Sequence, residues 1–154
     1  MKRRSAGLVM YRHRDGILEV LLIHPGGPFW KHKDAGAWSI PKGELDEDED
    51  PFMTAKREFI EETGFAPGET FIELQPIRQI AGKKVFAWAF EGDCDPSLMV
   101  SNTFEIEWPP RSGKLQTFPE ADRAAWFDPV TARKKIIASQ IPLLDELGAA
   151  LSAR

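Results

Sequence analysis

Runs of hydrophobic residues near the start of the chain predict two β-strands. One run lies within residues 5–12 (SAGLVMYR) and the other within residues 17–24 (ILEVLLIH). Asp15 and Gly16 stand between the two runs, and an Asp-Gly pair favours the tight turn of a β-hairpin. We therefore expect the chain to begin as an antiparallel pair of strands.

A loop and a helix are predicted next. Residues 25–37 (PGGPFWKHKDAGA) contain several Gly and Pro, which interrupt regular structure, and a short strand is expected at residues 38–41 (WSIP). Asp50 is a typical helix cap, the apolar positions after it recur at helical spacing, and Gly64 suits the left-handed conformation that ends a helix. The pattern predicts a helix of about three turns, from Pro51 to Thr63.

The remaining hydrophobic patterns indicate further strands and two more helices. The predicted strands lie at residues 70–80, 84–92, 104–108 and 124–127, and the first two flank a turn at residues 81–84 (AGKK). Helical patterns run from Asp128 to about Ala138 and over residues 142–151. This mixture of elements predicts an α/β or α+β fold.

Composition and charge indicate one globular domain over residues 1–154. A chain of 154 residues suits a single core, and 42% hydrophobic and 29% charged residues are typical of folded proteins. No repeat or linker divides the chain, and no segment has the apolar length of a membrane span. The net charge of -4 argues against general affinity for nucleic acids, so an anionic substrate requires a local cation.

The cysteine and histidine residues limit the chemistry further. Cys94 is the only cysteine, which excludes an internal disulfide and a thiolate zinc site and favours a reducing, cytoplasmic setting. His13, His24 and His32 lack the spacing of metal ligands, and each is expected at the surface or in a turn. The sequence leaves the oligomeric state open, and a homodimer is compatible with it.

The segment from Gly43 to Phe65 is rich in acidic residues and allows three interpretations. A solvated acidic surface is the ordinary one for a run of like charge. Alternate aspartates within residues 46–50 resemble an EF-hand calcium loop, but Pro51 and Arg57 stand where that loop needs Gly and Glu. A magnesium site is the third interpretation.

The predicted helix places three carboxylates on one face. At 100° per residue, Glu58, Glu61 and Glu62 fall within an arc of about 100°. Like charges at this spacing repel each other, and a bound hard cation such as Mg²⁺ would relieve the repulsion. Arg57 precedes Glu61 by four residues, so a salt bridge is expected to hold the Glu61 side chain.

The same segment resembles the Nudix box, the signature of the Nudix hydrolases. The matching positions are Gly43, Glu49, Arg57, Glu58, Phe59, Glu61, Glu62, Gly64 and Phe65. The resemblance implies an α/β/α sandwich with a central mixed sheet. It also implies hydrolysis of a pyrophosphate bond in a nucleoside diphosphate linked to another group, with Mg²⁺ or Mn²⁺ as cofactor.

The resemblance further implies roles for individual residues. Glu58 and Glu62 would be the leading metal ligands, and Gly43 would offer its backbone carbonyl. Glu61 would be a further ligand or would orient the attacking water, supported by Arg57. Glu49 would help to bind the metal or would stabilise the start of the helix.

Segments outside the box resemble the diadenosine tetraphosphate hydrolase branch and its bacterial relatives. They are residues 35–44 (AGAWSIPKGE), 5–12 and 122–127 (DRAAWF). This branch implies a small nucleotide substrate, such as diadenosine tetraphosphate or a nucleoside triphosphate. Lys42, and more weakly Lys31 and Lys33, are candidate partners for its phosphates, with a solvated loop as the alternative.

The proton acceptor has several candidates. Glu120 resembles the acid that some family members place before a late strand to deprotonate water, and Glu105 and Glu107 are alternatives on a predicted strand. Phe29, Trp30 and Trp108 are candidates to stack on a nucleobase, whereas Phe104 is expected in the core.

Two other functions are compatible with the same residues. One is a Nudix-like module that senses a nucleotide without cleaving it, although such modules commonly lose a carboxylate of the box and none is missing here. The other is a protein-interaction domain with an acidic surface, which would show no dependence on metal. The complete set of carboxylates favours the hydrolase.

Overall fold

The computed structural model describes residues 3–79 and 82–154 of the chain. Its first strands, β1 (Arg4–Arg14) and β2 (Ile17–Pro25), form the hairpin that the sequence predicts. Both residues of the Asp15-Gly16 turn have positive φ angles, of 52° and 78°, which match the twist of the flanking strands. This hairpin is the centre on which the rest of the sheet is built.

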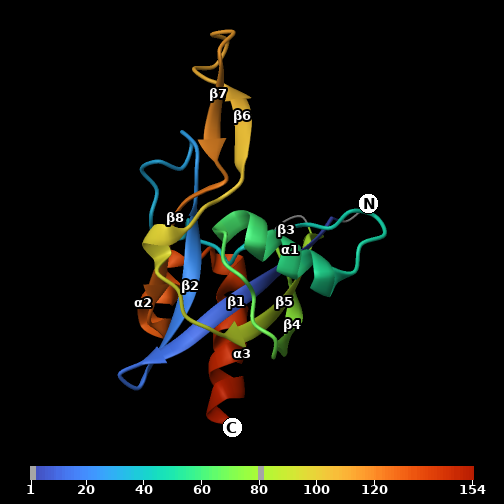
Figure 1. The fold of residues 1–154 in the computed structure, drawn as a ribbon, viewed down its shortest axis with the longest axis vertical. Helices are drawn as coiled ribbons and strands as arrows, with labels where there is room; N and C mark the ends of the chain where they lie inside the picture. The colour runs from blue at the N-terminus through green and yellow to red at the C-terminus, as the bar shows by residue number, and fades with distance from the viewer. Residues whose placement is uncertain (1–2, 80–81) are drawn as a thin grey trace.

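In the described part of the chain, six strands form a mixed sheet (Figure 1). Beside the first hairpin, its strands are β3 (Lys42–Glu44), β4 (Ile72–Arg78), β5 (Lys84–Glu91) and β8 (Ala121–Phe127). The strand order is β4-β5-β1-β2-β8, and β3 pairs with the start of β1. The β1–β5 pair is parallel and the others are antiparallel. The predicted mixed sheet is therefore confirmed.

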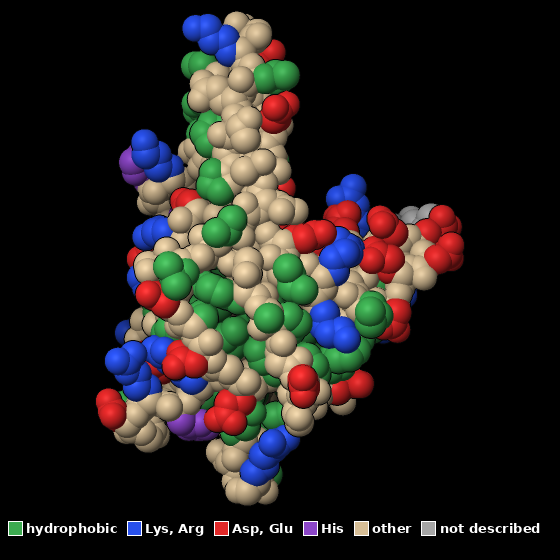
Figure 2. Space-filling view, viewed as in Figure 1, with side chains coloured by type: hydrophobic (Ala, Val, Ile, Leu, Met, Phe, Trp, Pro, Cys, Tyr) green, Lys and Arg blue, Asp and Glu red, His purple; other side chains and the backbone are tan. Residues whose placement is uncertain are grey.

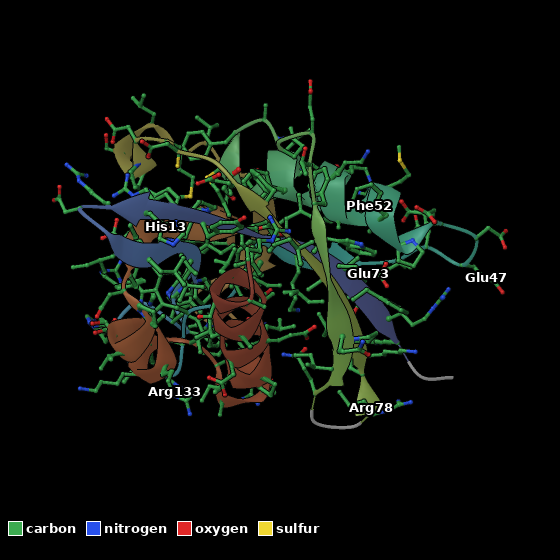
Figure 3. The ribbon with its side chains drawn as sticks, turned by 90° about the horizontal axis from the view of Figure 1, so that it is seen from below. His13, Glu47, Phe52, Glu73, Arg78 and Arg133 are labelled. Atoms are coloured by element: carbon green, nitrogen blue, oxygen red, sulfur yellow. The ribbon has the colours of Figure 1, made fainter. Side chains whose placement is uncertain are left out.

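Helices cover both faces of this sheet (Figure 3). Helix α1 (Pro51–Thr63) lies on one face, whereas α2 (Pro129–Lys135) and α3 (Ile141–Ser152) lie on the other. Because successive strand residues point to opposite faces, Leu8 joins the core under α1 and Val9 joins the core under α3. No helix among the described residues has the length and apolar character that crossing a membrane requires.

A separate two-stranded hairpin projects from the body of the protein (Figure 1). Its strands are β6 (Thr103–Glu107) and β7 (Leu115–Pro119), of which the sequence predicts only the first. Phe104 is half-buried beside Phe118, and a Cβ at Gly27 would lie 2.9 Å from its ring. The expectation that Phe104 belongs to the core is wrong, because its strand faces the loop after β2 instead of the main sheet.

The strand expected at residues 38–41 is replaced by isolated bridges. One of them joins Trp38 to Ile136, and regular pairing starts only at Lys42 in β3. The same bridge explains why α2 ends at Lys135 and not near residue 138, since Ile136 has extended backbone angles and pairs with Trp38. Both differences arise from a contact between segments that are distant in the sequence.

The other elements follow the predicted pattern more closely. The strand predicted at residues 124–127 extends back to Ala121, and α3 occupies the predicted C-terminal helix. Short 3₁₀ turns lie at η2 (Pro96–Leu98) and η3 (Ala138–Gln140). Ala81, which the sequence places in the turn between β4 and β5, lies outside the described residues.

Candidate active site

Helix α1 carries the acidic cluster, and its ends are fixed by the residues that the sequence indicates. Oδ2 of Asp50 accepts a hydrogen bond of 3.0 Å from the backbone N of Met53. At the other end, Gly64 has a φ of 77° and its N–H donates to the carbonyl of Ile60 at 2.8 Å. These caps satisfy backbone groups that the helix itself leaves unpaired. The predicted bounds of Pro51–Thr63 are confirmed.

Acidic side chains gather around α1 and the loop before it (Figure 2). Not all of them belong to one cluster, since Glu47 is exposed and points away from the fold (Figure 3). The glutamates of α1 divide by burial. Glu58 and Glu62 are half-buried between the helix and its neighbours, and Glu61 lies beside Arg57 with 35% of its side chain exposed. Of the three carboxylates that the spacing places on one face, Glu58 and Glu62 are therefore the inner ones and Glu61 is the outer one.

The carboxylate of Glu58 lies directly against the backbone of Gly43. A Cβ at position 43 would fall 2.0 Å from the Cδ of Glu58 and 2.2 and 2.4 Å from its two carboxylate oxygens. Real Cβ atoms essentially never approach other atoms this closely. The glycine at the middle of β3 thus creates the space that the Glu58 carboxylate fills.

Arg57 holds three carboxylates through one guanidinium group. Its Nη2 donates to both oxygens of Glu49 at 3.1 Å, and its Nη1 donates to both oxygens of Glu61 at 3.2 and 3.1 Å. The same Nη1 lies 3.1 Å from Oε1 of Glu58. Because the guanidinium group is planar and rigid, its two terminal nitrogens hold the carboxylates of Glu49 and Glu61 in a fixed relation to each other. The predicted Arg57–Glu61 pair is confirmed.

Glu49 links this network to the loop before α1. Its Oε1 accepts a hydrogen bond of 2.8 Å from the backbone N of Asp46, and this bond is the largest cause that lowers the pKa of Glu49. Burial has a smaller, opposing effect, and Thr54 and then Arg57 lower the pKa further. The carboxylate is therefore ionised at neutral pH and bonded on two sides. In the structure, Glu49 holds Arg57 in place, a role that the sequence left open between metal binding and the helix dipole.

Among the glutamates of α1, Glu62 has the pKa that is raised furthest. Burial, followed by the charges of Glu120 and Glu58, raises the pKa of Glu62 to about 7, and Lys42 opposes this rise. Burial and the charge of Glu61 also raise the pKa of Glu58. The two inner carboxylates therefore carry negative charge in a place where it is unfavourable. Such perturbed groups in a cluster indicate a functional site.

Lys42 directly precedes Gly43 in the sequence and lies half-buried in β3. Burial and the nearby charge of Lys83 lower the pKa of Lys42, whereas Glu44, Glu62 and Glu58 oppose this change. The charges of Glu58 and Glu62 thus interact electrostatically with the Lys42 side chain. Its contact with a substrate phosphate stays a prediction.

Glu120 is brought to the cluster by a backbone link that the sequence did not predict. The N–H of Asn102 donates to the carbonyl of Glu61 at 2.8 Å, and the N–H of Glu120 donates to the carbonyl of Asn102 at 2.7 Å. On its other side, the carbonyl of Glu120 accepts from the N–H of Gly26 at 2.9 Å. Because these bonds use only main-chain atoms, no side-chain pattern marks Asn102 in the sequence.

The alternative acids and nucleophiles do not join this cluster. Oε1 of Glu107 accepts from the backbone N of Arg111 at 2.7 Å, and Glu105 is exposed on the hairpin. Burial and the charge of Asp93 raise the pKa of Cys94 to about 11, so its thiol is protonated and unreactive at neutral pH. None of these groups is placed to attack a substrate at α1.

The expected position of His24 at the surface or in a turn is wrong. Its side chain is completely buried at the end of β2. Burial is tolerated because both ring nitrogens have hydrogen-bond partners, Asp122 and the carbonyl of Lys33. His13, by contrast, is exposed, as expected.

The donor set of the cluster fits a hard divalent cation. The candidate ligands are all oxygens, and the backbone of Gly43 adjoins the Glu58 carboxylate. A cation would also stabilise the negative charge of Glu62, whose pKa is raised by burial and by the neighbouring carboxylates. Among the described residues, no three His, Cys, Asp or Glu groups already form an arrangement that would hold a metal. Arg57 donates hydrogen bonds to oxygens of Glu58 and Glu61. The metal-ligand set stays a prediction.

A cavity of 710 Å³ is lined by residues of β8, of the loop after β2 and of the segment around η2. None of the glutamates of α1 lines it. Its lining combines the aromatic side chains of Trp38 and Phe127 with several cations. The cations are Lys31, Lys33, Arg123 and Lys135. The combination of aromatic surface and positive charge suits a nucleotide better than an uncharged ligand.

Sequence comparison connects this geometry to known proteins. The family model described as the NUDIX domain matches residues 1–147. An RNA pyrophosphohydrolase of Caulobacter vibrioides is 41% identical over 134 residues, and the match covers 71% of this chain and 76% of the relative.

Solved structures share the fold. The Caenorhabditis elegans Ap4A hydrolase in a binary complex is 25% identical with a TM-score of 0.66, and the match covers 99% of each chain. The NUDIX domain of Shewanella oneidensis NrtR, solved with ADP ribose, is 17% identical with a TM-score of 0.67, covering 98% of this chain and 89% of that one. At 17% identity, the similarity to the NrtR domain concerns the fold alone.

Proposed function

Because the chain belongs to the NUDIX domain family, we propose that it is a pyrophosphohydrolase that cleaves a phosphoanhydride bond in a nucleoside polyphosphate. One observation carries the proposal. Glu58, Glu61, Glu62 and Glu120 form an electrostatically coupled cluster of carboxylates at helix α1. Clustered carboxylate oxygens suit a hard divalent cation, which can bridge them to the phosphates of a substrate.

In this proposal, the oxygens of Gly43, Glu58, Glu61 and Glu62 hold Mg²⁺ or Mn²⁺. When bound, the cation supplies Lewis acidity toward the phosphoryl oxygens and toward water. Arg57 keeps the Glu61 carboxylate in position through its two hydrogen bonds. Glu49 in turn keeps Arg57 in position.

Glu120 accepts the proton of the attacking water in this scheme. Its side chain is exposed, so water reaches it, and its charge is felt by Glu62. A carboxylate contributes to such a step when it lies within hydrogen-bond reach of the water. The bonds of Asn102 and Gly26 to its backbone hold Glu120 at the edge of the cluster.

The basic residues around the cluster neutralise the substrate. Lys42 lies on the β3 side of the inner carboxylates, while Lys31 and Lys33 line the cavity beside β8. We place the nucleoside in this cavity and the phosphates between the cavity and α1. A volume of 710 Å³ is within the usual range for a small-molecule site. The net charge of -4 favours a small nucleotide over a long nucleic acid.

A substrate panel tests the proposal. It contains diadenosine tetraphosphate, nucleoside triphosphates, nucleotide sugars and a short RNA with a 5′-triphosphate, because the relatives include an Ap4A hydrolase and an RNA pyrophosphohydrolase. We expect cleavage with Mg²⁺ or Mn²⁺, detected by mass spectrometry, and incorporation of ¹⁸O from labelled water into one product phosphate. Chelation of the metal should abolish it.

The result also separates an enzyme from a sensing module. Binding of a nucleotide by calorimetry without turnover of any compound in the panel would contradict the proposal and favour the sensor. Glu105→Gln is a matched control for substitutions in the cluster, since Glu105 is an exposed carboxylate on the projecting hairpin. Its turnover should equal that of the unmodified protein.

A further inference from the structure

Each ring nitrogen of His24 faces an atom that accepts hydrogen bonds. Nδ1 lies 2.8 Å from Oδ1 of Asp122, and Nε2 lies 2.5 Å from the carbonyl oxygen of Lys33. A carbonyl oxygen and an ionised carboxylate have no hydrogen to donate, and a neutral imidazole has only one N–H. A neutral ring would therefore leave one of these short contacts with two facing lone pairs.

We infer that His24 is a buried imidazolium paired with Asp122, and that it is a positioning residue for the cavity wall formed by Lys31 and Lys33. A doubly protonated ring donates to both neighbours and satisfies both distances. A buried charge is sustainable only when it is paired and fully hydrogen-bonded, which this arrangement provides. Asp122 remains ionised because 33% of its side chain is exposed and Nε of Arg123 lies 3.6 Å from Oδ1.

An irregularity in β8 brings the carboxylate to the ring. His24 pairs with Arg123 and Pro25 pairs with Ala121, so Asp122 is the additional residue of a β-bulge. Bulges redirect a side chain that regular pairing would place elsewhere. Trp38 closes the other side of the ring, edge-on, with the ring centroids 5.3 Å apart.

The hydrogen bond to Lys33 attaches the loop between β2 and β3 to the sheet. This loop supplies Lys31, Lys33 and Asp34 to the cavity lining. A second attachment comes from Asp34, which accepts from Nε1 of Trp38 at 2.8 Å and pairs with Lys135. Without the N–H of His24, the carbonyl of Lys33 loses its partner, so the loop is held at one point fewer.

The positioning role rests on the proposed function, because it assumes that the cavity receives the substrate. The protonation state does not, since it follows from the contacts alone. The charged groups around the ring are Asp122, Arg123, Lys33, Asp34 and Lys135. The two parts are therefore tested separately.

Nitrogen-15 NMR of the histidine rings tests the protonation state in the full-length protein. At neutral pH, we expect two ring N–H signals for His24 and two nitrogen shifts typical of imidazolium. The signals are assigned by their loss in His24→Gln. A single ring N–H with one nitrogen shift typical of an unprotonated site would overturn the inference.

Substitution of Asp122 provides a second test. In Asp122→Asn, the new amide donates to Nδ1, so we expect a neutral ring that keeps its bond to Lys33. In Asp122→Leu, Nδ1 of His24 has no partner, so the ring is no longer held in the orientation that bonds Lys33. We therefore expect faster tryptic cleavage after Lys31 and Lys33. Glu105→Gln is the control, because Glu105 is an exposed carboxylate on the projecting hairpin, so the His24 ring should keep both N–H signals and the loop both attachments. Equal cleavage rates in all variants would overturn the positioning role.

Kinetics then separates positioning from a general loss of structure. We expect Asp122→Leu to raise KM about tenfold while kcat stays within about twofold of the unmodified protein. Asp122→Asn should have a KM close to that of the unmodified protein. Equal kinetic losses in both variants would contradict the role. If no compound of the substrate panel is turned over, the NMR and proteolysis results still decide the inference, while the proposed function fails by itself.

Discussion

The Glu58 carboxylate occupies the space that a side chain at Gly43 would need. Gly43→Ala places a methyl group 2.0 Å from the present position of Cδ, so the carboxylate must move. We expect kcat/KM to fall about 100-fold, the usual effect of displacing a catalytic group by about 1 Å. Steady-state kinetics and thermal unfolding measure the loss of activity and the smaller loss of stability.

Gly148→Ala is the matched control for this substitution. Gly148 lies inside α3, and a Cβ there meets no atom within 4 Å. We expect unchanged activity and an unfolding free energy higher by about 0.5–1 kcal/mol, because alanine is the better helix former. Equal activity losses in Gly43→Ala and Gly148→Ala would show that the close approach at Gly43 has no special role.

Removal of either inner carboxylate should abolish most catalysis while the fold remains. Glu58→Gln and Glu62→Gln keep the size of the side chain but remove its charge and much of its affinity for a cation. We expect kcat to fall by about 10²- to 10⁴-fold with an unchanged circular dichroism spectrum. Near-normal turnover in both variants would exclude these residues from the mechanism.

The raised pKa of Glu62 predicts a pH dependence of stability without divalent cations. Between its ordinary value of 4.5 and about 7, the folded state binds more protons than the unfolded state. Stability therefore falls as the pH rises through this window. In EDTA, we expect a lower Tm at about pH 8 than at about pH 5, and Glu62→Gln should reduce the difference.

Metal addition supplies the complementary measurement. Mg²⁺ or Mn²⁺ should raise the Tm at the higher pH, because a ligand that binds only the folded state stabilises it. The increase should be smaller in Glu62→Gln than in the unmodified protein. The same increase in both would mean that the cation binds elsewhere.

The guanidinium group of Arg57 should couple Glu49 and Glu61 energetically. Arg57→Lys keeps the charge but cannot donate to both oxygens of Glu49 and of Glu61 in the same plane. We expect kcat to fall about tenfold. In a double-mutant cycle on kcat/KM with Glu61→Gln, we expect a coupling of about 0.5–3 kcal/mol. Additive effects would show that Arg57 does not act through Glu61.

The sequence predicts α1 and its contacts well because their signals are local. Asp50, Pro51 and Gly64 mark the ends of the helix through short-range capping, and the spacing of Arg57 and Glu61 determines their pairing. The fold class follows from hydrophobic periodicity in the same way. Each of these predictions needs only residues within a few turns of one another.

Contacts between distant segments explain what the sequence does not predict. The second strand of the projecting hairpin, β7, is mostly exposed, and its residues (LQTFP) do not alternate between apolar and polar. The role of Asn102 depends on main-chain bonds to Glu61 and Glu120, and the burial of His24 depends on a bulge in β8. In each case the partner is identified only when the chain is folded.

The position of the β6–β7 hairpin has a practical consequence. At its base, Asn102 is bonded to the backbones of Glu61 and Glu120, whereas its tip stands clear of the body (Figure 1). A fluorescent dye attached at Ser112 would therefore report on any movement of the β6–β7 hairpin during turnover, while leaving the reacting groups unmodified.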